Sequence, residues 1–338
     1  MPEGAMSTQT FVLYINNARI PGEREGEIKK IIITDKLNAP SAFTIYASDP
    51  ESQWRENDDY FIGSRVKILM GYKDGISELI IGDITGLSCK YRRNQAPEVV
   101  ISGQNLVHRL KRTIKNQAFS EMAVTDIISQ LADNAGLSAD VEDLTYEHPF
   151  ALQHQKNDYE YLHILAERYD CYFTVFDTTL TFKRLQNNLA EDVVLEYGKT
   201  LLEFLPEADT SKLVSEVEVF AWNPATHEAL SGNSTAQDID SAGGAVINDQ
   251  FGGAKTIHID QYALDQNGID QCAVDILAQN TRDYVTGRGS TFGNPDIKAG
   301  TIVKVEGVGE KFSGKYYVLS ATHTLVPLRG YKTSFVLL

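Results

Sequence analysis

Residues 63–75 read GSRVKILMGYKDG, and this stretch decides the fold. Apolar and polar residues alternate through Val66, Ile68 and Met70, which is the period of a β-strand with one buried face. Asp74-Gly75 follows, and this dipeptide between two strand-like segments is a strong signal for a tight hairpin turn. We therefore predict a β-hairpin in which residues 65–70 pair with a second strand over residues 76–91.

A similar stretch occurs near the other end of the chain. Residues 300–305 read GTIVKV, against GSRVKI at residues 63–68. Further on, VLSAT at residues 318–322 lies near the place that IGDIT has at residues 81–85. Two ordinary hairpins can be alike by coincidence, but the repeat also fits a duplicated β-module. Three copies of a chain with two such modules would form a ring of six near-equivalent units.

Short strands also surround the first hairpin. Strand-like runs separated by turn residues cover 11–15, 28–33, 42–46 and 98–102. Several short strands at this spacing predict a barrel or a sandwich. We assign residues 11–112 to a first β-domain, preceded by residues 1–10, which we expect to be a disordered leader or a remnant of expression.

Residues 113–187 have a different pattern, that of a small inserted α+β domain. Ser120 is placed to cap a helix with apolar residues at 124, 127, 128 and 131. Asn157 and Glu160 have the spacing of a capping box before a second one-sided helix. A hairpin across residues 177–179 is predicted to complete the domain.

Residues 188–338 return to β-patterns and form a second β-domain. A strand is predicted over residues 214–222. Residues 229–256 are rich in Gly, Ser, Ala, Asn and Asp, which predicts a flexible loop. The apolar spacing of the next segment predicts a helix over residues 262–286, ended by Gly287.

Composition excludes several function classes. The 338 residues, 42% of them apolar, are enough for two or three domains, each with its own core. A net charge of −15 repels phosphate, so we expect no specific nucleic-acid binding. No run of 18 apolar residues exists, so no membrane-spanning helix is expected. The first residues lack a secretory signal, which predicts folding in the cytoplasm.

No motif points to catalysis, a cofactor or a metal. Cys89, Cys171 and Cys272 lie far apart without a Cys-x-x-Cys pair, which predicts buried free thiols. The three histidines within residues 148–163 lack the spacing of a zinc motif, and neither a nucleophile elbow nor a phosphate loop is present. We predict no catalytic, cofactor-binding or metal-binding residue, although any two of the 46 acidic residues could meet in space.

One region is basic. Its cations are Lys90, Arg92, Arg93, Arg109, Lys111, Arg112 and Lys115. They could form a solvated strand end and loop. They could also form an ion-paired interface with an acidic neighbouring subunit, because three chains of this charge repel one another unless cations relieve the repulsion locally.

Four segments of the sequence, taken in order, resemble one known family. They are the stretch from Phe61 to Tyr72 with IGDIT at 81–85, the helix NDYEYLHILAE at 157–167 after Gln153, VEV at 217–219 before Trp222-Asn223-Pro224, and residues 312–333 with FSGKYYV and His323. Together they resemble the late control D proteins of contractile phages and the N-terminal part of VgrG-type hub proteins of contractile injection systems. The sequence departs from the family pattern at Ile81, where an aromatic residue is common.

The resemblance implies an α+β fold with two β-barrel-like tube domains, 11–112 and 188–338, related by duplication around the insert. It implies a structural, non-enzymatic hub, a homotrimer with pseudo-six-fold symmetry. The partners would be inner-tube or tube-initiator proteins and a spike, either a separate protein or a C-terminal continuation. The chain would assemble in the cytoplasm and then become part of a phage tail or tail-like particle.

The structural and interface candidates come from these motifs, the repeat and the basic region. They are Gly63, Val66, Ile68, Tyr72, Arg92, Arg93, Val303, Phe312, Gly314 and Tyr317. Two other function classes stay open. A tail-tip cell-wall hydrolase would need an acid/base pair in a cleft, and a receptor-binding tail protein would expose aromatic platforms. Most of the 16 tyrosines fall within strand and helix patterns, which favours packing.

Overall fold

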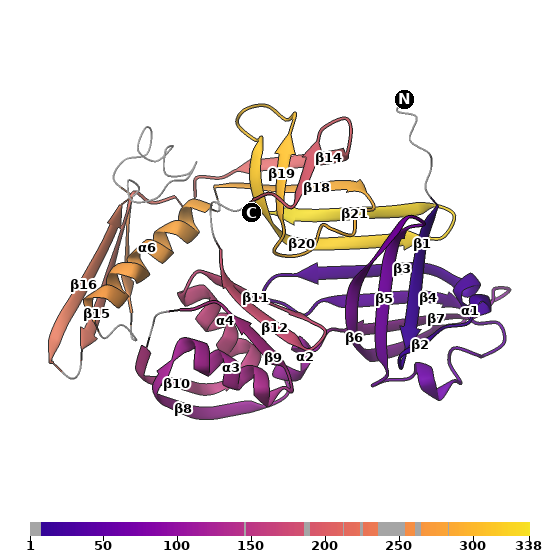
Figure 1. Ribbon diagram of the computed structural model, residues 1–338, viewed down its shortest axis with the longest axis horizontal. Coiled ribbons are helices and arrows are strands. Elements are labelled where there is room, and N and C mark those ends of the chain that lie inside the picture. The colour runs from indigo at the N-terminus through magenta and orange to yellow at the C-terminus, as the bar shows by residue number, and fades with distance from the viewer. Residues whose placement is uncertain are drawn as a thin grey trace.

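The structure is a computed structural model that describes residues 8–144, 147–185, 190–211, 213–223, 226–235, 254–260, 265–282 and 284–338. This part of the chain is mostly β with few helices, which confirms the prediction of a β-rich α+β protein (Figure 1). Within the described residues, none of the helices combines the length and the apolar character needed to cross a bilayer.

One 13-stranded sheet dominates the molecule (Figure 1). Its neighbouring strands are, in order, β14 (Leu201–Ala208), β18 (Val285–Phe292), β21 (Gly330–Leu337), β20 (Gly314–Val326), β3 (Ile28–Lys36), β4 (Ala42–Ser48), β7 (Glu98–Gln104), β6 (Gly75–Lys90), β5 (Arg65–Tyr72), β1 (Gln9–Ile15) and β2 (Ala18–Arg19). Off this path, β13 (Val193–Glu196) pairs with β19 (Ile302–Glu306), which pairs with β20. The two ends of the chain therefore contribute to one continuous sheet.

The hairpin predicted from residues 63–75 is present. β5 and β6 pair from Arg65 with Asp83 to Tyr72 with Gly75, across a two-residue turn. Val66, Ile68 and Met70 are fully buried, as their alternation predicts. The predicted strands of the first β-region are all observed, each with slightly different ends.

Two short helical segments cover the first core. They are α1 (Gly22–Glu27) and η1 (Asp58–Tyr60). Trp54 is fully buried beside them and donates its indole N–H to Glu27, 2.6 Å away. This bond satisfies the one polar atom of a large buried ring.

The insert lies beneath the sheet in Figure 1. Its elements are α2 (Val107–Leu110), β8 (Ile114–Ala123), α3 (Val124–Asn134), β9 (Ser138–Val141), β10 (Glu147–Asn157), α4 (Asp158–Arg168), β11 (Cys171–Phe176) and β12 (Thr179–Arg184). The capping box of Asn157 and Glu160 is confirmed at the start of α4. The predicted cap at Ser120 is wrong, because Ser120 pairs with Phe150 inside β8 and α3 begins at Val124 without a side-chain cap.

A second, smaller sheet with one helix projects to the left in Figure 1 and is called the arm below. It consists of β15 (Glu216–Asn223), β16 (Glu228–Thr235), β17 (Lys255–Ile259) and α6 (Gln266–Arg282). The helix predicted over 262–286 is therefore too long. Tyr284 lies outside it and β18 begins at Val285, whereas 261–264 and 283 fall outside the described residues.

The flexible loop predicted over 229–256 is wrong at both ends, where β16 and β17 form, and its middle, 236–253, lies outside the described residues. The small residues of β16 have a packing reason. A Cβ atom at Gly232 would lie 2.6 Å from the carbonyl oxygen of Ile269 in α6. The close approach of the helix therefore requires a glycine at this position. Composition alone indicates a loop here, because it does not show that the glycine packs against a helix.

Candidate assembly surface

The two ends of the main sheet repeat one strand order. In the first half the neighbours are β1, β5, β6, β7, β4 and β3, and in the second half β13, β19, β20, β21, β18 and β14. In each half the members also come in the same order along the chain. Each half has its own core cluster, although Leu325 and Tyr331 of the second half belong to the core of the first.

The hydrogen-bonding registers of the two halves match position by position. Arg65 pairs with Asp83, and Ile302 pairs with Tyr317. The next residues along the long strands, Ile84 and Val318, pair with Gly103 and Leu337. Val66 and Val303 therefore occupy the same position in the two halves, as the sequence repeat predicts.

Two of the three β-bulges in the first half have a counterpart in the second, whereas the register shift between Ile68 and Leu69 of β5 has none. The long strands shift register between Ile84 and Gly86 in one half and between Val318 and Ser320 in the other. The outer strands shift between Ile28 and Lys30 in β3 and between Leu201 and Glu203 in β14. A bulge re-aims the strand that holds it, so matched bulges give both halves the same local bend.

The halves differ at one strand. β1 runs antiparallel to β5, whereas β13 runs parallel to β19. The connection between the two strands of the hairpin also differs, because β5 and β6 are joined by a two-residue turn and β19 and β20 by residues 307–313.

The halves are joined by one strand pair, β3 with β20, which we call the internal seam. Its rungs are Ser320 with Lys36, Ala321 with Asp35, Thr322 with Thr34, His323 with Ile33, Thr324 with Ile32 and Leu325 with Ile31. On the core face, Ile31 and Ile33 are fully buried. On the open face, the hydroxyl groups of Thr34 and Thr322 lie 3.4 Å apart.

His323 fixes the core face of the internal seam. Its Nε2 lies 3.0 Å from the carbonyl oxygen of Ile297, and its Nδ1 lies 2.8 Å from the Tyr331 hydroxyl and 3.1 Å from the hydroxyl of Thr333. Burial lowers the pKa of His323 to about 4, so the ring is neutral. His323 is thus a packing and hydrogen-bonding residue.

In the internal seam, β3 and β20 pair with each other, but their counterparts in the opposite halves have no such partner within the chain. The counterpart of β20 is β6, and the counterpart of β3 is β14. Among the described residues, β6 beyond Ile84 pairs only with β7, and β14 pairs only with β18 apart from an isolated bridge between its first residue, Leu201, and Tyr197. Unpaired edge groups are a template for another strand. We call these two the open edges.

The open edges carry opposite charges. Lys90 ends β6 and exposed Arg92 follows it, whereas β14 presents exposed Glu203 and Glu207. Lys90 has one ion pair, with Glu98 at 3.6 Å. Within the described part of the chain, no carboxylate pairs with Arg92 or Arg93 and no cation pairs with Glu203 or Glu207. The side chain of Leu205, between the two glutamates, is 61% exposed.

Sequence reasoning missed Glu203 and Glu207, because nothing in their local pattern marks β14 as an edge strand.

The remaining cations of the predicted basic cluster are engaged within the chain. Arg109 pairs with Asp83 at 3.0 Å, and Lys115 with Asp158 at 2.6 Å. The Lys111 ammonium lies 4.0 Å from the centre of the Tyr159 ring. Exposed Arg112 contacts only the ring of His108, at 3.3 Å. Apart from Lys111 over its ring, the cations of the cluster without a carboxylate partner in the described part of the chain are therefore Arg92, Arg93 and Arg112, and the first two lie next to the end of β6.

The other predicted site residues are packing and turn residues. Val66, Ile68, Val303 and Tyr317 are buried, and half-buried Tyr72 packs against Tyr331 at 6.2 Å between ring centres. Gly63 has a φ of 97° and donates its N–H to Ile84, and half-buried Phe312 accepts a hydrogen bond from the Tyr316 hydroxyl close to Gly314. A direct contact by these residues with a neighbour stays a prediction, as does the contact of Arg92 and Arg93.

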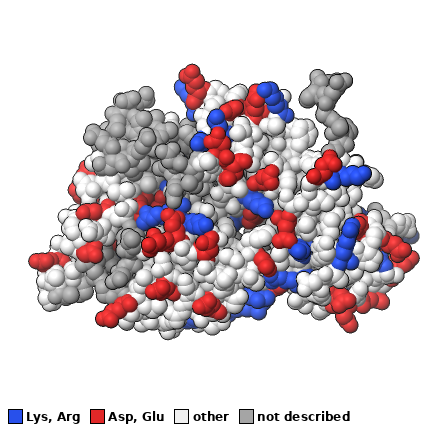
Figure 2. Space-filling model, in the orientation of Figure 1, with Lys and Arg blue, Asp and Glu red and all other residues white. Residues whose placement is uncertain are grey.

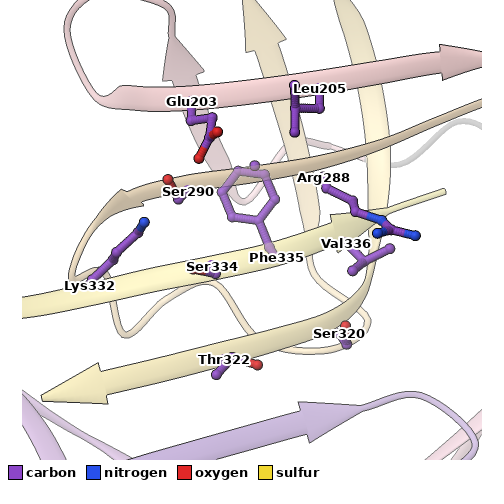
Figure 3. A pocket seen from close by; sticks show the side chains of 11 residues that line it. Glu203, Leu205, Arg288, Ser290, Ser320, Thr322, Lys332, Ser334, Phe335 and Val336 are labelled. Carbon is purple, nitrogen blue, oxygen red and sulfur yellow. The ribbon is translucent and has the colours of Figure 1, made fainter.

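The open face of β14, β18, β21 and β20 holds a shallow hollow of about 260 Å³. Figure 3 shows Ser290, Ser334 and Thr322 along one row across the strands, which follows the rungs from Glu203 to Thr322. Lys332 lies toward one end of the hollow and Arg288 toward the other. The lining is hydroxyl-rich with charges of both signs, and Figure 2 shows acidic and basic side chains interspersed over the visible surface.

Several groups that resemble catalytic ones are engaged in the fold. Burial disfavours the Asp83 carboxylate, but hydrogen bonds from His108, Arg109 and Arg65 outweigh it and lower its pKa. Both ring nitrogens of His108 have partners, Asp83 and Arg112. Burial raises the pKa of the Cys272 thiol to about 12, which keeps it protonated. No cluster that could hold a metal occurs among the described residues.

The arm has an exposed apolar face opposite α6. Phe220 and Trp222 of β15 lie on it with Ile257 and Ile259 of β17, and Phe220 pairs with Ile259 across the strands. An exposed aromatic pair is the platform that a receptor-binding role requires, so this alternative keeps a specific feature in its favour.

One family model matches the sequence, and several solved structures share the fold. The sequence model of the family described as the Alg8 N-terminal domain matches residues 5–326. No curated protein matches the sequence. The structure resembles the 43 kDa tail protein of prophage MuSo2 from Shewanella oneidensis, with a TM-score of 0.73, 13% identity and 98% of both chains covered.

Two further solved structures are similar. The tail protein from Neisseria meningitidis MC58 has a TM-score of 0.74 and 14% identity over 98% of this chain and 96% of the other. An E. coli protein, c3393, described as a type VI secretion component similar to the T4 tail proteins gp27 and gp5, has a TM-score of 0.62 and 10% identity over 96% and 76%. The predicted resemblance to tail and injection-system proteins is therefore confirmed for the fold.

Proposed function

We infer that this chain, which belongs to the family of the Alg8 N-terminal domain, is a structural component of a phage tail or a tail-like injection system. The inference is supported by a fold shared, over nearly the whole chain, with two tail proteins and a type VI secretion component. It is further supported by the internal partners of Asp83 and His108 and by the burial of Cys272, which give these three residues a structural role in the fold.

More specifically, we propose that the chain is a baseplate hub of three copies. The observation that carries this proposal is the repeated strand order with matched registers and matched bulges. We attribute the repeat to duplication of a β-module. Three chains with two such modules would present six near-equivalent units, which suits a six-fold tube on one side and a three-fold spike on the other.

In such a ring, we propose that the open face of the main sheet lines the channel. Thr322, Ser290 and Ser334 would supply short neutral side chains together with Thr34, whose hydroxyl group lies beside that of Thr322, and Lys332 would offset Glu203. A wall of hydroxyl groups with balanced charge attracts neither DNA nor protein strongly, so a passenger would move through without binding.

The mass of the purified chain in solution tests the ring. We expect a trimer at micromolar concentrations and physiological salt. Reversing Arg92 and Arg93 to Glu should shift the mass toward the monomer, because it removes the cations of the basic region that lie next to the end of β6 without a carboxylate partner. Reversing two exposed cations in the turns of the second half, Lys311 and Arg329, is the matched control and should leave the trimer intact.

A chain that stays monomeric at every concentration would reject the ring. A trimer whose mass is the same in the Arg92 and Arg93 variant would keep the ring and reject the basic region as part of its interface.

A further inference from the structure

The internal seam provides a template for a contact between copies. We propose that β14 of one copy pairs antiparallel with the second half of β6 of the next copy, in the register of the internal seam. The inference rests on the proposed ring. Beyond the ring itself, it specifies which two strands meet, their register and the ion pairs that select the partner strand.

The register follows from the matched positions. In the first half, Ile33 pairs with Phe43, Phe43 with Gly103, and Gly103 with Ile84. In the second half, Pro206 pairs with Gly287, Gly287 with Leu337, and Leu337 with Val318. Ile33 therefore corresponds to Pro206, and Ile84 to Val318. Carrying the rungs of the internal seam across this correspondence pairs Gly86 with Asp209, Leu87 with Ala208, Ser88 with Glu207, Cys89 with Pro206, Lys90 with Leu205 and Tyr91 with Phe204.

The charges of the open edges fit this register. Lys90 faces Leu205, which places Glu203 and Glu207 on its two diagonals, within reach of a long side chain. Arg92 lies two residues beyond the end of β6. In a contact that extends the strand by these two residues, it would come beside Glu203. In the internal seam the residues at the position of Lys90 and its partner are Thr324 and Ile32, which carry no charge. Charge therefore distinguishes the contact between copies from the contact within the chain.

The contact would also cover apolar surface. Leu205 is 61% exposed in the isolated chain and would pack beside the stem of Lys90. On the core side, half-buried Leu87 and Cys89, which pack against the first core, would meet Ala208 and Pro206. The patch on β6 differs from the patch on β14, so the contact is heterologous, and a heterologous contact can close into a ring.

Pro206 makes this contact weaker than its internal counterpart. Proline in a sheet sits on an edge strand with its missing N–H facing outward. The rung of Pro206 with Cys89 therefore has one hydrogen bond fewer than the rung of Ile33 with His323. A proline also protects the edge from pairing with unrelated strands, which leaves the ion pairs to select the partner.

Disulfide cross-linking tests the register. The variant Ser88→Cys with Glu207→Cys, on a Cys89→Ala background, places two cysteines on the open face directly opposite each other, within disulfide reach. The matched control, Ser88→Cys with Glu203→Cys, uses the same strands and face but moves one cysteine four residues, about 13 Å, along β14. After mild oxidation, we expect covalent dimers and trimers in the first variant, roughly tenfold above the control.

The mass of each variant, measured before oxidation, separates the two proposals. Trimers that cross-link in register and not in the control support the strand pairing. Trimers that cross-link equally in both variants, or in neither, reject the pairing and leave the ring. Monomers at every concentration reject the ring and the pairing with it.

Discussion

The internal seam and the open edges use the same strand positions but differ in chemistry. In the internal seam, Ile31 and Ile33 are fully buried and Leu325 is 3% exposed. At the corresponding positions of the open edges stand Phe204, Pro206 and Tyr91, of which Tyr91 is 68% exposed. The same backbone arrangement thus gives a permanent contact in the internal seam, where apolar side chains fill the core side. At the open edges, where charges and a proline take their place, the proposed contact would be separable.

The difference has a consequence for assembly. Burial of the apolar side chains holds the two halves of one chain together in every condition in which the chain is folded. The ion pairs proposed between Lys90 or Arg92 and the glutamates of β14 weaken with salt and with distance. The proposed contact between copies would therefore form only after each chain has folded.

The largest expected effect comes from weakening the internal seam. Ile33→Ala removes buried methyl and methylene groups from the first core and leaves a cavity beside His323. We expect the free energy of unfolding to fall by about 2–5 kcal/mol, the usual range for such a truncation. Urea unfolding followed by tryptophan fluorescence measures it, because Trp54 lies in the same core.

The matched change on an open edge is Leu205→Ala, at the position that corresponds to Ile32 in β3. It should change the stability of the monomer by less than about 0.5 kcal/mol, because the side chain is exposed. It should nevertheless lower the mass of the assembly. Equal losses of monomer stability in the two variants would remove the distinction between the seam and the edges.

The free energy of unfolding should also depend on pH, through His323. His323 is neutral in the folded chain, where its pKa is about 4, against 6.5 for an ordinary histidine. Below about pH 6.5 the unfolded chain binds a proton that the folded chain does not, so stability is lost as the pH falls toward 4. The pKa difference corresponds to about 3 kcal/mol between neutral pH and pH 4.

His323→Gln isolates this contribution, because glutamine keeps a donor and an acceptor but does not titrate. The variant should lose less stability than the natural chain between pH 7 and pH 4, measured by urea unfolding at both. The same acid sensitivity in both proteins would mean that other groups, chiefly carboxylates, account for it. The corresponding residue on the open edge is Cys89, so we expect no histidine-dependent acid step in the association of copies.

Much of the fold could be predicted from local pattern. Strands of alternating apolar residues and the Asp74-Gly75 signal predicted the first hairpin, but the turn is one residue earlier than predicted, because Tyr72 pairs with Gly75 and the turn residues are Lys73 and Asp74. The repeat at residues 300–305 predicted the correct register of Val303 against Val66. The continuation of the repeat was misaligned, because Ile84 and not Ile81 occupies the position of Val318. The two hairpins differ in strand length and in their connection, and such differences shift an alignment that assumes constant spacing.

The rest depends on contacts between distant segments. Gly232 and Ser234 read as a loop from composition, but they belong to a strand that α6 approaches closely. Glu203 and Glu207 read as ordinary surface residues. Their place on an unpaired edge follows only from knowing that β14 has one neighbour, which no local pattern reveals. The sequence therefore suggested the basic residues of the proposed contact and did not suggest its acidic ones.

The smallest expected loss of stability comes from Asn157, which lies outside both the internal seam and the open edges. A change at this residue tests whether assembly depends on the stability of the chain. Asn157 caps α4, accepting a hydrogen bond from the N–H of Glu160 at 2.8 Å, while Glu160 accepts one from the N–H of Asn157. Asn157→Ala should lower the free energy of unfolding by about 1 kcal/mol, and Asn157→Ser should retain most of it. If folding and association are separate steps, the trimer mass and the in-register cross-link should be unchanged in Asn157→Ala. A loss of trimer in proportion to this loss of stability would instead show that association responds to the stability of the whole chain and not to the chemistry of its edges.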